Sequence, residues 1–185
     1  MSIILIDSYS EDKCDANSVC YSANSPNGQS TTGNGLPLAM VKFYLSKKGT
    51  ITGTCYAKLY AHTGTFGSST GKGTGDALAI SEGVNVSTLT ESNTLVNFYF
   101  TGSNAIELIN GTHYVIAVSF NGGDLDNCIQ IGVDSSSPSH NGANTYFQTT
   151  TWYTNIGFDV CFYLYASTVT PIVGNKYAIP PFKKA

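Results

Sequence analysis

The chain has 185 residues, a length that suits one domain with a substantial core. Only 11% of the residues are charged, against roughly 25% in an average domain, whereas 42% are hydrophobic and 12% aromatic, which argues against disorder. The net charge is −3, and every basic residue is lysine. Nucleic acid is therefore not an expected partner, because arginine is the residue best suited to bidentate recognition of phosphate and guanine.

The N-terminal segment MSIILIDSYSED contains an apolar run of only four residues with no positive charge before it. It has the features of neither a signal peptide nor a membrane span, so we expect no membrane partner. Five cysteines are present, an odd number, and at least one thiol is unpaired. Cys14 and Cys20 could form a disulfide, but we expect buried, reduced thiols in a protein that is assembled in cytoplasm.

The first part of the chain combines a short apolar strand with polar sequence. Residues 3–6 predict a strand, and residues 7–27 predict a long surface loop. Pro26-Asn27-Gly28 predicts a turn at the end of that loop, because proline and glycine favour turn geometry. Residues 28–32 then predict a brief strand.

Two strongly alternating segments follow. Residues 38–46 direct Val41, Phe43 and Leu45 to one side, and residues 54–61 alternate small or apolar residues with tyrosine and lysine. The glycine-rich stretch 63–76 contains GSSTGKGTG, which lacks the spacing of a phosphate-binding P-loop. We expect that stretch to be a mobile loop.

The most β-prone run is NGTHYVIAVSFNGGD, residues 110–124, which lies between two turn signals. We expect a central strand with one face in the core and the other covered only lightly. The residues expected on the core face are Tyr114, Ile116, Val118 and Phe120.

Further strands complete an all-β pattern without helical periodicity. They are expected at residues 77–81, 84–86, 95–101, 105–109, 128–134, 144–153 (a hairpin with the only tryptophan) and 159–165. Short strands separated by turns predict an antiparallel two-sheet β-sandwich, for which a jelly roll is the expected topology. This domain is expected to span residues 1–167.

Residues 168–185 have a different character, with three prolines, no alternation and a basic end. We expect an extended C-terminal arm that docks on a neighbouring subunit, since so many apolar groups are unfavourable in solvent. The apolar residues of this assembly arm are Ile172, Val173, Tyr177, Ile179 and Phe182.

Several of these segments resemble a jelly-roll-like module of phage virion proteins and of modular bacterial surface proteins. The resemblance covers about residues 3–165 and implies a β-sandwich used for display or adhesion, with no catalytic residues to transfer. Without a signal peptide, flanking domains or a wall anchor, the chain resembles a virion part more closely. The resemblance rests on VKFYLSKKG (41–49), YAKLYAHTGTFG (56–67), NGTHYVIAVSFNGGD (110–124), VDSSSPSHNG (133–142) and DVCFYLY (159–165).

Outward-pointing tyrosines are the first candidate binding residues. They could form an aromatic face that stacks on sugar rings, or they could pack under loops and in a subunit interface, which tyrosine also favours. The six residues are Tyr44, Tyr56, Tyr60, Tyr99, Tyr163 and Tyr165.

Polar side chains give only weak alternatives. Asp124, Asp126 and Asp134 could supply oxygen ligands for Ca²⁺, although aspartate in turns is common without a metal. Ser137 and His140 could be combined with Asp134 into a hydrolase triad on paper, but no nucleophile-elbow sequence supports it. We therefore expect no catalytic residue, no metal and no cofactor.

The sequence thus predicts a non-enzymatic structural protein of a phage or similar virus particle. It would decorate the capsid or form part of a fibre, with capsid or fibre subunits as partners, as a homo-oligomer assembled in the host cytoplasm. The alternative is a carbohydrate-binding or adhesion module that recognises a cell-surface glycan.

Overall fold

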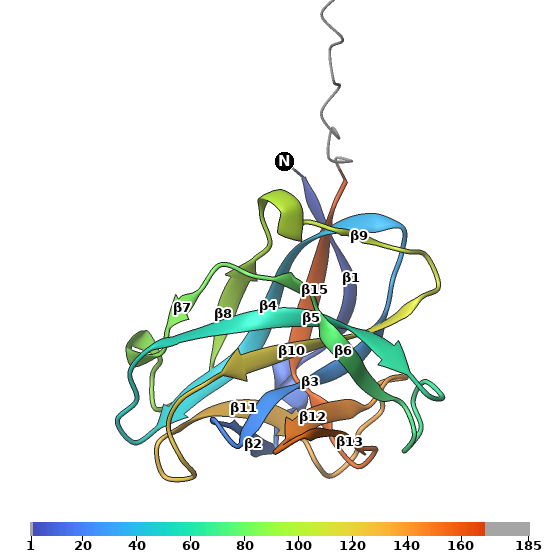
Figure 1. Ribbon diagram of the computed structural model, residues 1–185. Coiled ribbons are helices and arrows are strands. Elements are labelled where there is room, and N and C mark those ends of the chain that lie inside the picture. The colour runs from blue at the N-terminus through green and yellow to red at the C-terminus, as the bar shows by residue number, and fades with distance from the viewer. Residues whose placement is uncertain (1, 169–185) are drawn as a thin grey trace, which may run out of the picture.

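The computed structural model describes residues 2–168 of the chain (Figure 1). Short 3-10 helices lie at Glu11–Lys13 (η1), Val86–Thr88 (η2) and Gly102–Asn104 (η3). The strands are β1 Ile3–Tyr9, β2 Ala16–Cys20, β3 Asn24–Thr32, β4 Leu36–Lys48, β5 Thr54–Thr63, β6 Lys72–Ile80, β7 Val84–Asn85, β8 Thr94–Tyr99, β9 Glu107–Leu108, β10 His113–Phe120, β11 Cys128–Asp134, β12 Asn144–Gln148, β13 Thr151–Asn155, β14 Asp159–Val160 and β15 Phe162–Ser167.

These strands form two antiparallel sheets. The first sheet has the order β1-β15-β4-β11-β14, with β2 on β11 and with β8 and β9 on β4. The second sheet has the order β13-β12-β3-β10-β5-β6, with β7 on β5. The prediction of an all-β, two-sheet antiparallel sandwich is therefore confirmed. Its jelly-roll topology stays a prediction, and the expected arm lies outside the described residues from position 169 onward.

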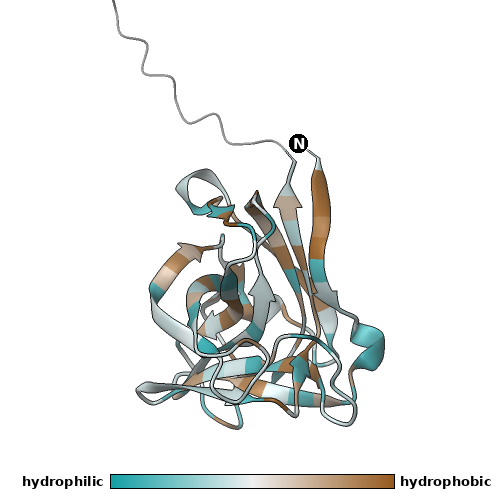
Figure 2. Ribbon diagram, turned by 90° about the vertical axis from the view of Figure 1, so that its right-hand side faces the viewer, coloured by the Kyte–Doolittle hydropathy of each residue, from teal (hydrophilic) through white to brown (hydrophobic). Residues whose placement is uncertain are grey.

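The core lies between the two sheets and is built from the alternation that the sequence shows. Apolar and polar segments alternate along several strands (Figure 2). Phe43, Phe98 and Phe162 of the first sheet are fully buried, and the Phe43 and Phe98 rings meet edge to face at 6.1 Å between centroids. Ile116 of β10 is also fully buried. The predicted inward assignment of Phe43 and Ile116 is confirmed.

The predicted loop at residues 7–27 and the turn at Pro26-Asn27-Gly28 are wrong. β1 continues to Tyr9, and β2 pairs with β11 within the supposed loop. Pro26 and Gly28 lie inside the nine-residue strand β3. Gly28 is needed there because a Cβ atom at this position would lie 2.0 Å from the Ile116 carbonyl oxygen.

The glycine-rich segment 63–76 is also more ordered than the sequence suggests. β6 begins at Lys72 and pairs with β5 through His62–Gly73 and Ala61–Thr74. The loop is therefore limited to residues 64–71. Glycine usually weakens a strand, but here Gly73 leaves room for a ring from another strand, as described below.

The five cysteines are free thiols, as predicted, and Cys20, Cys55, Cys128 and Cys161 are buried. Burial raises the pKa of the Cys55 thiol to about 12, so the reactive thiolate is scarce at neutral pH. Within residues 2–168, no helix is long and apolar enough to span a membrane.

Phe98 and Tyr99 give a matched test of the inward and outward assignment, because they are neighbours in β8. Phe98 is fully buried and Tyr99 is 47% exposed. We expect Phe98→Ala to lower the free energy of unfolding by about 3–5 kcal/mol through lost burial and a cavity. Tyr99→Ala should cost clearly less in the same denaturant titration. Equal losses would contradict the assignment.

Candidate ligand-binding site

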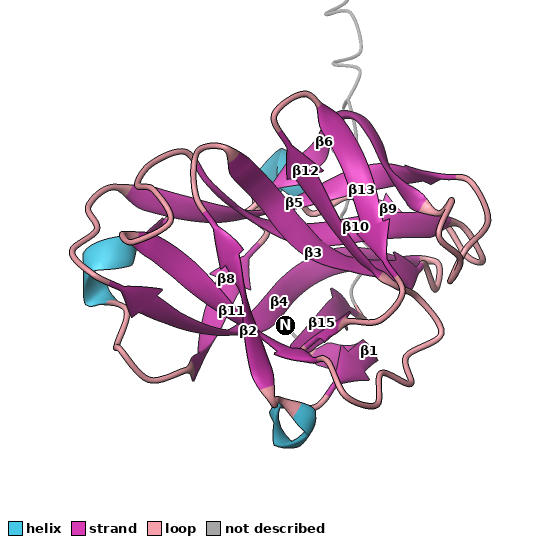
Figure 3. Cartoon of the chain, turned by 90° about the horizontal axis from the view of Figure 1, so that it is seen from below, coloured by secondary structure: helices cyan, strands magenta, loops and turns pink. Residues whose placement is uncertain are grey.

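The outer face of the second sheet is curled so that its two edges approach each other. β6 and β13 are at opposite ends of the strand order, yet they are in contact (Figure 3). The hydroxyl group of Thr154 in β13 donates a hydrogen bond to the Gly71 carbonyl just before β6. The β12–β13 hairpin thus bends over the face of β10 that points away from the sandwich core.

Trp152 of β13 fills the space that this curl encloses. A Cβ atom at Gly73 of β6 would lie only 2.8 Å from the indole ring, so the absence of a side chain lets the ring pack there. The indole also meets Tyr60 edge to face at 4.9 Å and Phe147 at 5.7 Å between centroids. These rings form a small cluster outside the main core.

The cluster covers the outer side of β10. Val115 and Ala117 are fully buried beneath it. The expectation that this face is only lightly covered is therefore wrong. The hairpin and its tryptophan supply the cover, and the prediction from β10 alone could not include them.

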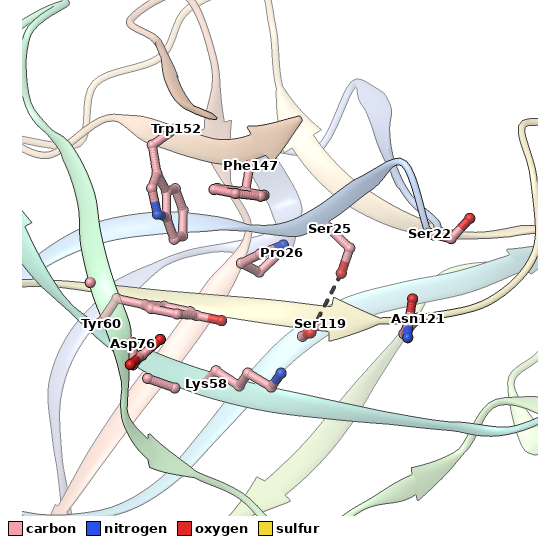
Figure 4. Close-up of a pocket in the computed structure, with 12 residues that line it drawn as sticks. Ser22, Ser25, Pro26, Lys58, Tyr60, Asp76, Ser119, Asn121, Phe147 and Trp152 are labelled. Atoms are coloured by element: carbon pink, nitrogen blue, oxygen red, sulfur yellow. Dashed lines mark hydrogen bonds between the residues drawn. The ribbon is translucent and has the colours of Figure 1, made fainter. Parts of the chain in front are cut away.

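Beside the cluster lies an open groove of about 380 Å³ (Figure 4). Tyr60, Phe147 and Trp152 line one part of it, and polar side chains surround the rest. The polar residues are Ser22 and Ser25 near β3, Lys58 of β5, Asp76 of β6, Ser119 of β10 and Asn121 after β10. The groove therefore combines aromatic surface with a cation, a carboxylate, an amide and hydroxyl groups.

The electrostatics of the groove favour recognition of a polar ligand by hydrogen bonds. Asp76 is exposed, Lys58 is half-buried, and the described residues contain no ion pair that engages either of them. Burial raises the pKa of Tyr60 to about 12, so its hydroxyl group stays protonated and can donate at neutral pH. Ser25 donates to Ser119 at 3.4 Å and accepts from the Phe120 amide at 2.9 Å, which fixes one wall.

The six predicted tyrosines do not form one face. Tyr44, Tyr99, Tyr163 and Tyr165 lie on strands of the first sheet, whereas Tyr56 and Tyr60 lie on β5 of the second sheet. On the first sheet, the Lys42 ammonium group lies 5.5 Å from the centre of the Tyr165 ring, and Tyr163 donates to the Glu11 carboxylate. Of the six, only Tyr60 lines the groove.

Trp152, Phe147 and Asp76 are among the groove residues that the sequence did not point to. The signal for Trp152 was present, because the only tryptophan was placed in a predicted hairpin at residues 144–153. What the sequence lacked was the partner, since Gly73 was assigned to a loop. The contact between them joins two strands that are distant in the chain.

Ser137, His140 and Asp134 do not form a triad. The Gly142 amide donates to His140 Nδ1 at 2.9 Å, so the proton is on Nε2, which donates to Asp7 Oδ1 at 3.0 Å. Both ring nitrogens are thus engaged without Ser137. Asp134 instead accepts from the Tyr9 hydroxyl at 2.6 Å and from the Ser137 amide at 2.9 Å. This network ties β1 to the segment that follows β11.

The other histidines pack against an aromatic ring. The His113 and Phe66 rings are stacked at 4.1 Å between centroids, and the His62 ring lies 5.8 Å from that of His113. Residues 2–168 contain no group of three or more histidine, cysteine, aspartate or glutamate side chains placed to hold a metal ion.

The three aspartates considered for Ca²⁺ have separate roles. Asp124 accepts from the amides of Asp126 and Asn127 at 2.8 and 2.9 Å, as in an ordinary aspartate turn. The Asp126 carboxylate pairs with Lys48 at 2.9 Å. Asp134 is at the far end of β11, roughly 20 Å further along the strand, and is bonded to Tyr9. The structure does not bring the three together.

Comparison with known proteins identified no relative of the chain. No family model, curated protein or solved structure matches the chain. The resemblance to a jelly-roll module of virion proteins therefore stays a prediction from the sequence. The arguments about function depend on the geometry of the described residues.

The bond between Tyr9 and Asp134 leads to a prediction about pH. Hydrogen bonding from the Tyr9 hydroxyl is the main cause that lowers the pKa of Asp134 below its usual value. A carboxyl group with a lowered pKa stabilises the fold above the pKa of the unfolded chain, about 4, and this contribution is lost as pH falls through the folded pKa. We expect Tyr9→Phe to lower the free energy of unfolding at pH 7, and to lower it by less at a pH below about 4.

The measurement is chemical denaturation of the wild type and the variant at both pH values. Tyr165→Phe is the control, because the Tyr165 ring contacts Lys42 rather than a carboxylate. A deficit of Tyr9→Phe that is the same at both pH values would show that the hydroxyl group does not stabilise the ionised form of Asp134.

Proposed function

We propose that the protein is a non-enzymatic module that binds carbohydrate through the groove on the outer face of the second sheet. The observation that carries this proposal is the meeting of Trp152, Tyr60 and Phe147 with the polar side chains of Lys58 and Asp76 in one open hollow. Binding pockets typically join apolar surface to a few placed polar groups in this way.

Carbohydrate is the ligand class that this combination fits best. A sugar ring offers an apolar C–H face that can lie against an aromatic ring, and hydroxyl groups that both donate and accept hydrogen bonds. Asp76 accepts, Lys58 donates, and Asn121 does both, so adjacent hydroxyl groups can be satisfied at once. A purely apolar ligand would leave these polar groups unpaired on binding.

A second proposal concerns where the module is used: as a structural protein of a phage or similar virus particle, in capsid decoration or in a fibre. Its support is the resemblance in sequence, together with the position of the chain ends. β1 pairs with β15, and the Thr168 amide donates to the Ser2 carbonyl at 3.0 Å, so the first and last described residues lie side by side at one end of the sandwich (Figure 1). Attachment there leaves the groove accessible.

A jelly-roll topology is part of this second proposal. The first strand β1 pairs with the last strand β15, while β3, β10 and β5 are neighbours in the other sheet. Early and late strands are therefore neighbours in both sheets, as expected when two Greek keys are wound together.

The groove proposal predicts that a glycan array identifies a ligand and that Asp76→Ala weakens its binding. Loss of a hydrogen bond to a charged group corresponds to about tenfold or more in Kd, measured by calorimetry. Asp76 is exposed, so the variant is expected to fold normally. Trp152→Ala should weaken binding as well, with a thermal melt to check folding.

Asp12→Ala is the control, because Asp12 is an exposed carboxylate on η1 and does not line the groove. It should bind like the wild type. A wild-type protein that binds no glycan, or an Asp76→Ala variant that binds as tightly as the wild type, would refute the assignment of the groove.

A further inference from the structure

A second, apolar hollow lies at the end of the sandwich where both chain ends leave. It has a volume of about 240 Å³, and it is formed by β1, β4, β15 and the segment that follows β8. Leu38 and Phe100 are buried in it, whereas Ile3 and Tyr99 are 41% and 47% exposed at its margin. Unlike the groove, it is mainly apolar.

The adjoining strand β1 extends this apolar surface. Ile3, Ile4 and Leu5 are consecutive and 41%, 41% and 49% exposed. The beginning of β1 is coloured as hydrophobic next to the N-terminus in Figure 2. β1 is also the edge of the first sheet, so one side of its backbone has no neighbouring strand among the described residues. An apolar edge strand favours the addition of an extended segment.

Two carboxylates lie beside the hollow. Glu82 is exposed; its amide donates to the Tyr99 carbonyl at 2.8 Å, and Thr101 donates to its side chain at 3.1 Å. Tyr99 and Thr101 both line the hollow. Glu107 is also exposed and pairs with Pro37, next to Leu38. The apolar site therefore has an acidic margin.

The sequence of residues 169–185 has the complementary composition. It contains six larger apolar side chains and no acidic residue, and its lysines are Lys176, Lys183 and Lys184. The segment follows Thr168, and the residue before Thr168, Ser167, lines the hollow. We propose that the hollow and the β1 edge bind residues 169–185 of a second copy of this chain, so that two copies exchange their C-terminal segments.

The second copy is favoured over the chain's own segment because β15 already occupies one side of β1. The Thr168 amide donates to the Ser2 carbonyl at 3.0 Å, so the described chain ends on the paired side of β1. The free edge of β1 is on the opposite side. A second copy can approach that edge directly, and reciprocal exchange gives the closed two-fold symmetry that is usual for homodimers.

This proposal goes beyond ligand binding, and it supplies the subunit contact on which the proposed use in a particle rests. It is tested with charge-reversed variants of the full chain. The acceptor variant carries Glu82→Lys and Glu107→Lys, and the donor variant carries Lys183→Glu and Lys184→Glu. All four positions are outside the groove, so sugar binding is expected to be unchanged in both.

The readout is the dissociation constant of self-association, measured by sedimentation. We expect the wild-type chain to form dimers and each variant alone to dimerise about tenfold more weakly or worse, because like charges meet at the margin. A mixture of the two variants should regain association, since the acidic segment of one then meets the basic margin of the other. Asp12→Lys, outside the hollow, should dimerise like the wild type.

Three outcomes would overturn the proposal. The wild-type chain could stay monomeric at all concentrations, the variants could dimerise like the wild type, or the mixture could fail to associate. The first of these outcomes, a wild-type chain that stays monomeric, would leave the hollow to the chain's own segment. None of these results would affect the assignment of the groove, which is tested by sugar binding.

Discussion

The arrangement of this protein depends on β10 being buried on both of its faces. Its Tyr114, Ile116, Val118 and Phe120 side chains lie in the core between the sheets, while Val115 and Ala117 are covered by the aromatic cluster on the other side. A strand with two apolar faces cannot leave either one in water without losing about 25 cal/mol per Å² of apolar surface. The second sheet therefore curls until β13 reaches β6, and the curl produces the groove.

Buried polar groups impose a second constraint on the fold, because each of them needs a hydrogen-bond partner inside the sandwich. Gln29 is fully buried, donates to Asp159 Oδ1 at 2.7 Å and accepts from the Val160 amide at 3.0 Å. Burial is the main cause that raises the pKa of Asp159, and the Gln29 and His140 donors oppose it. A buried polar group without such partners is strongly unfavourable. These bonds join β3 to β14 across the two sheets and fix how the sheets face each other.

Much of the fold could be predicted from alternation. β4, β5, β10 and β15 have apolar residues at every second position, and the inward assignment of Phe43 and Ile116 is confirmed. β2 and the first half of β3 were missed, because β3 buries polar residues and β2 buries only Cys20. Asn27 is 1% exposed, and its side chain is satisfied by Ser18, Val19 and Asn144. A sequence pattern cannot distinguish such a residue from one in a turn until its partners are known.

The candidate site could be predicted far less completely. Tyr60 was identified because it points outward from a strand, but outward side chains were expected to share one face, and they are divided between two sheets. The contact between Trp152 and Gly73 depends on the curvature of the sheet, which no local pattern encodes. The sequence therefore indicated aromatic residues suited to binding without indicating which of them meet.

The placement of Trp152 separates the part of the protein that holds the fold from the part that shapes the groove. The indole belongs to the outer cluster and not to the core between the sheets, whereas β12 of the same hairpin pairs with β3 within the sheet. Gly73 controls how closely the indole ring packs against β6, because any larger residue would displace the ring. One backbone position on β6 thus sets the shape of the surface beside the groove.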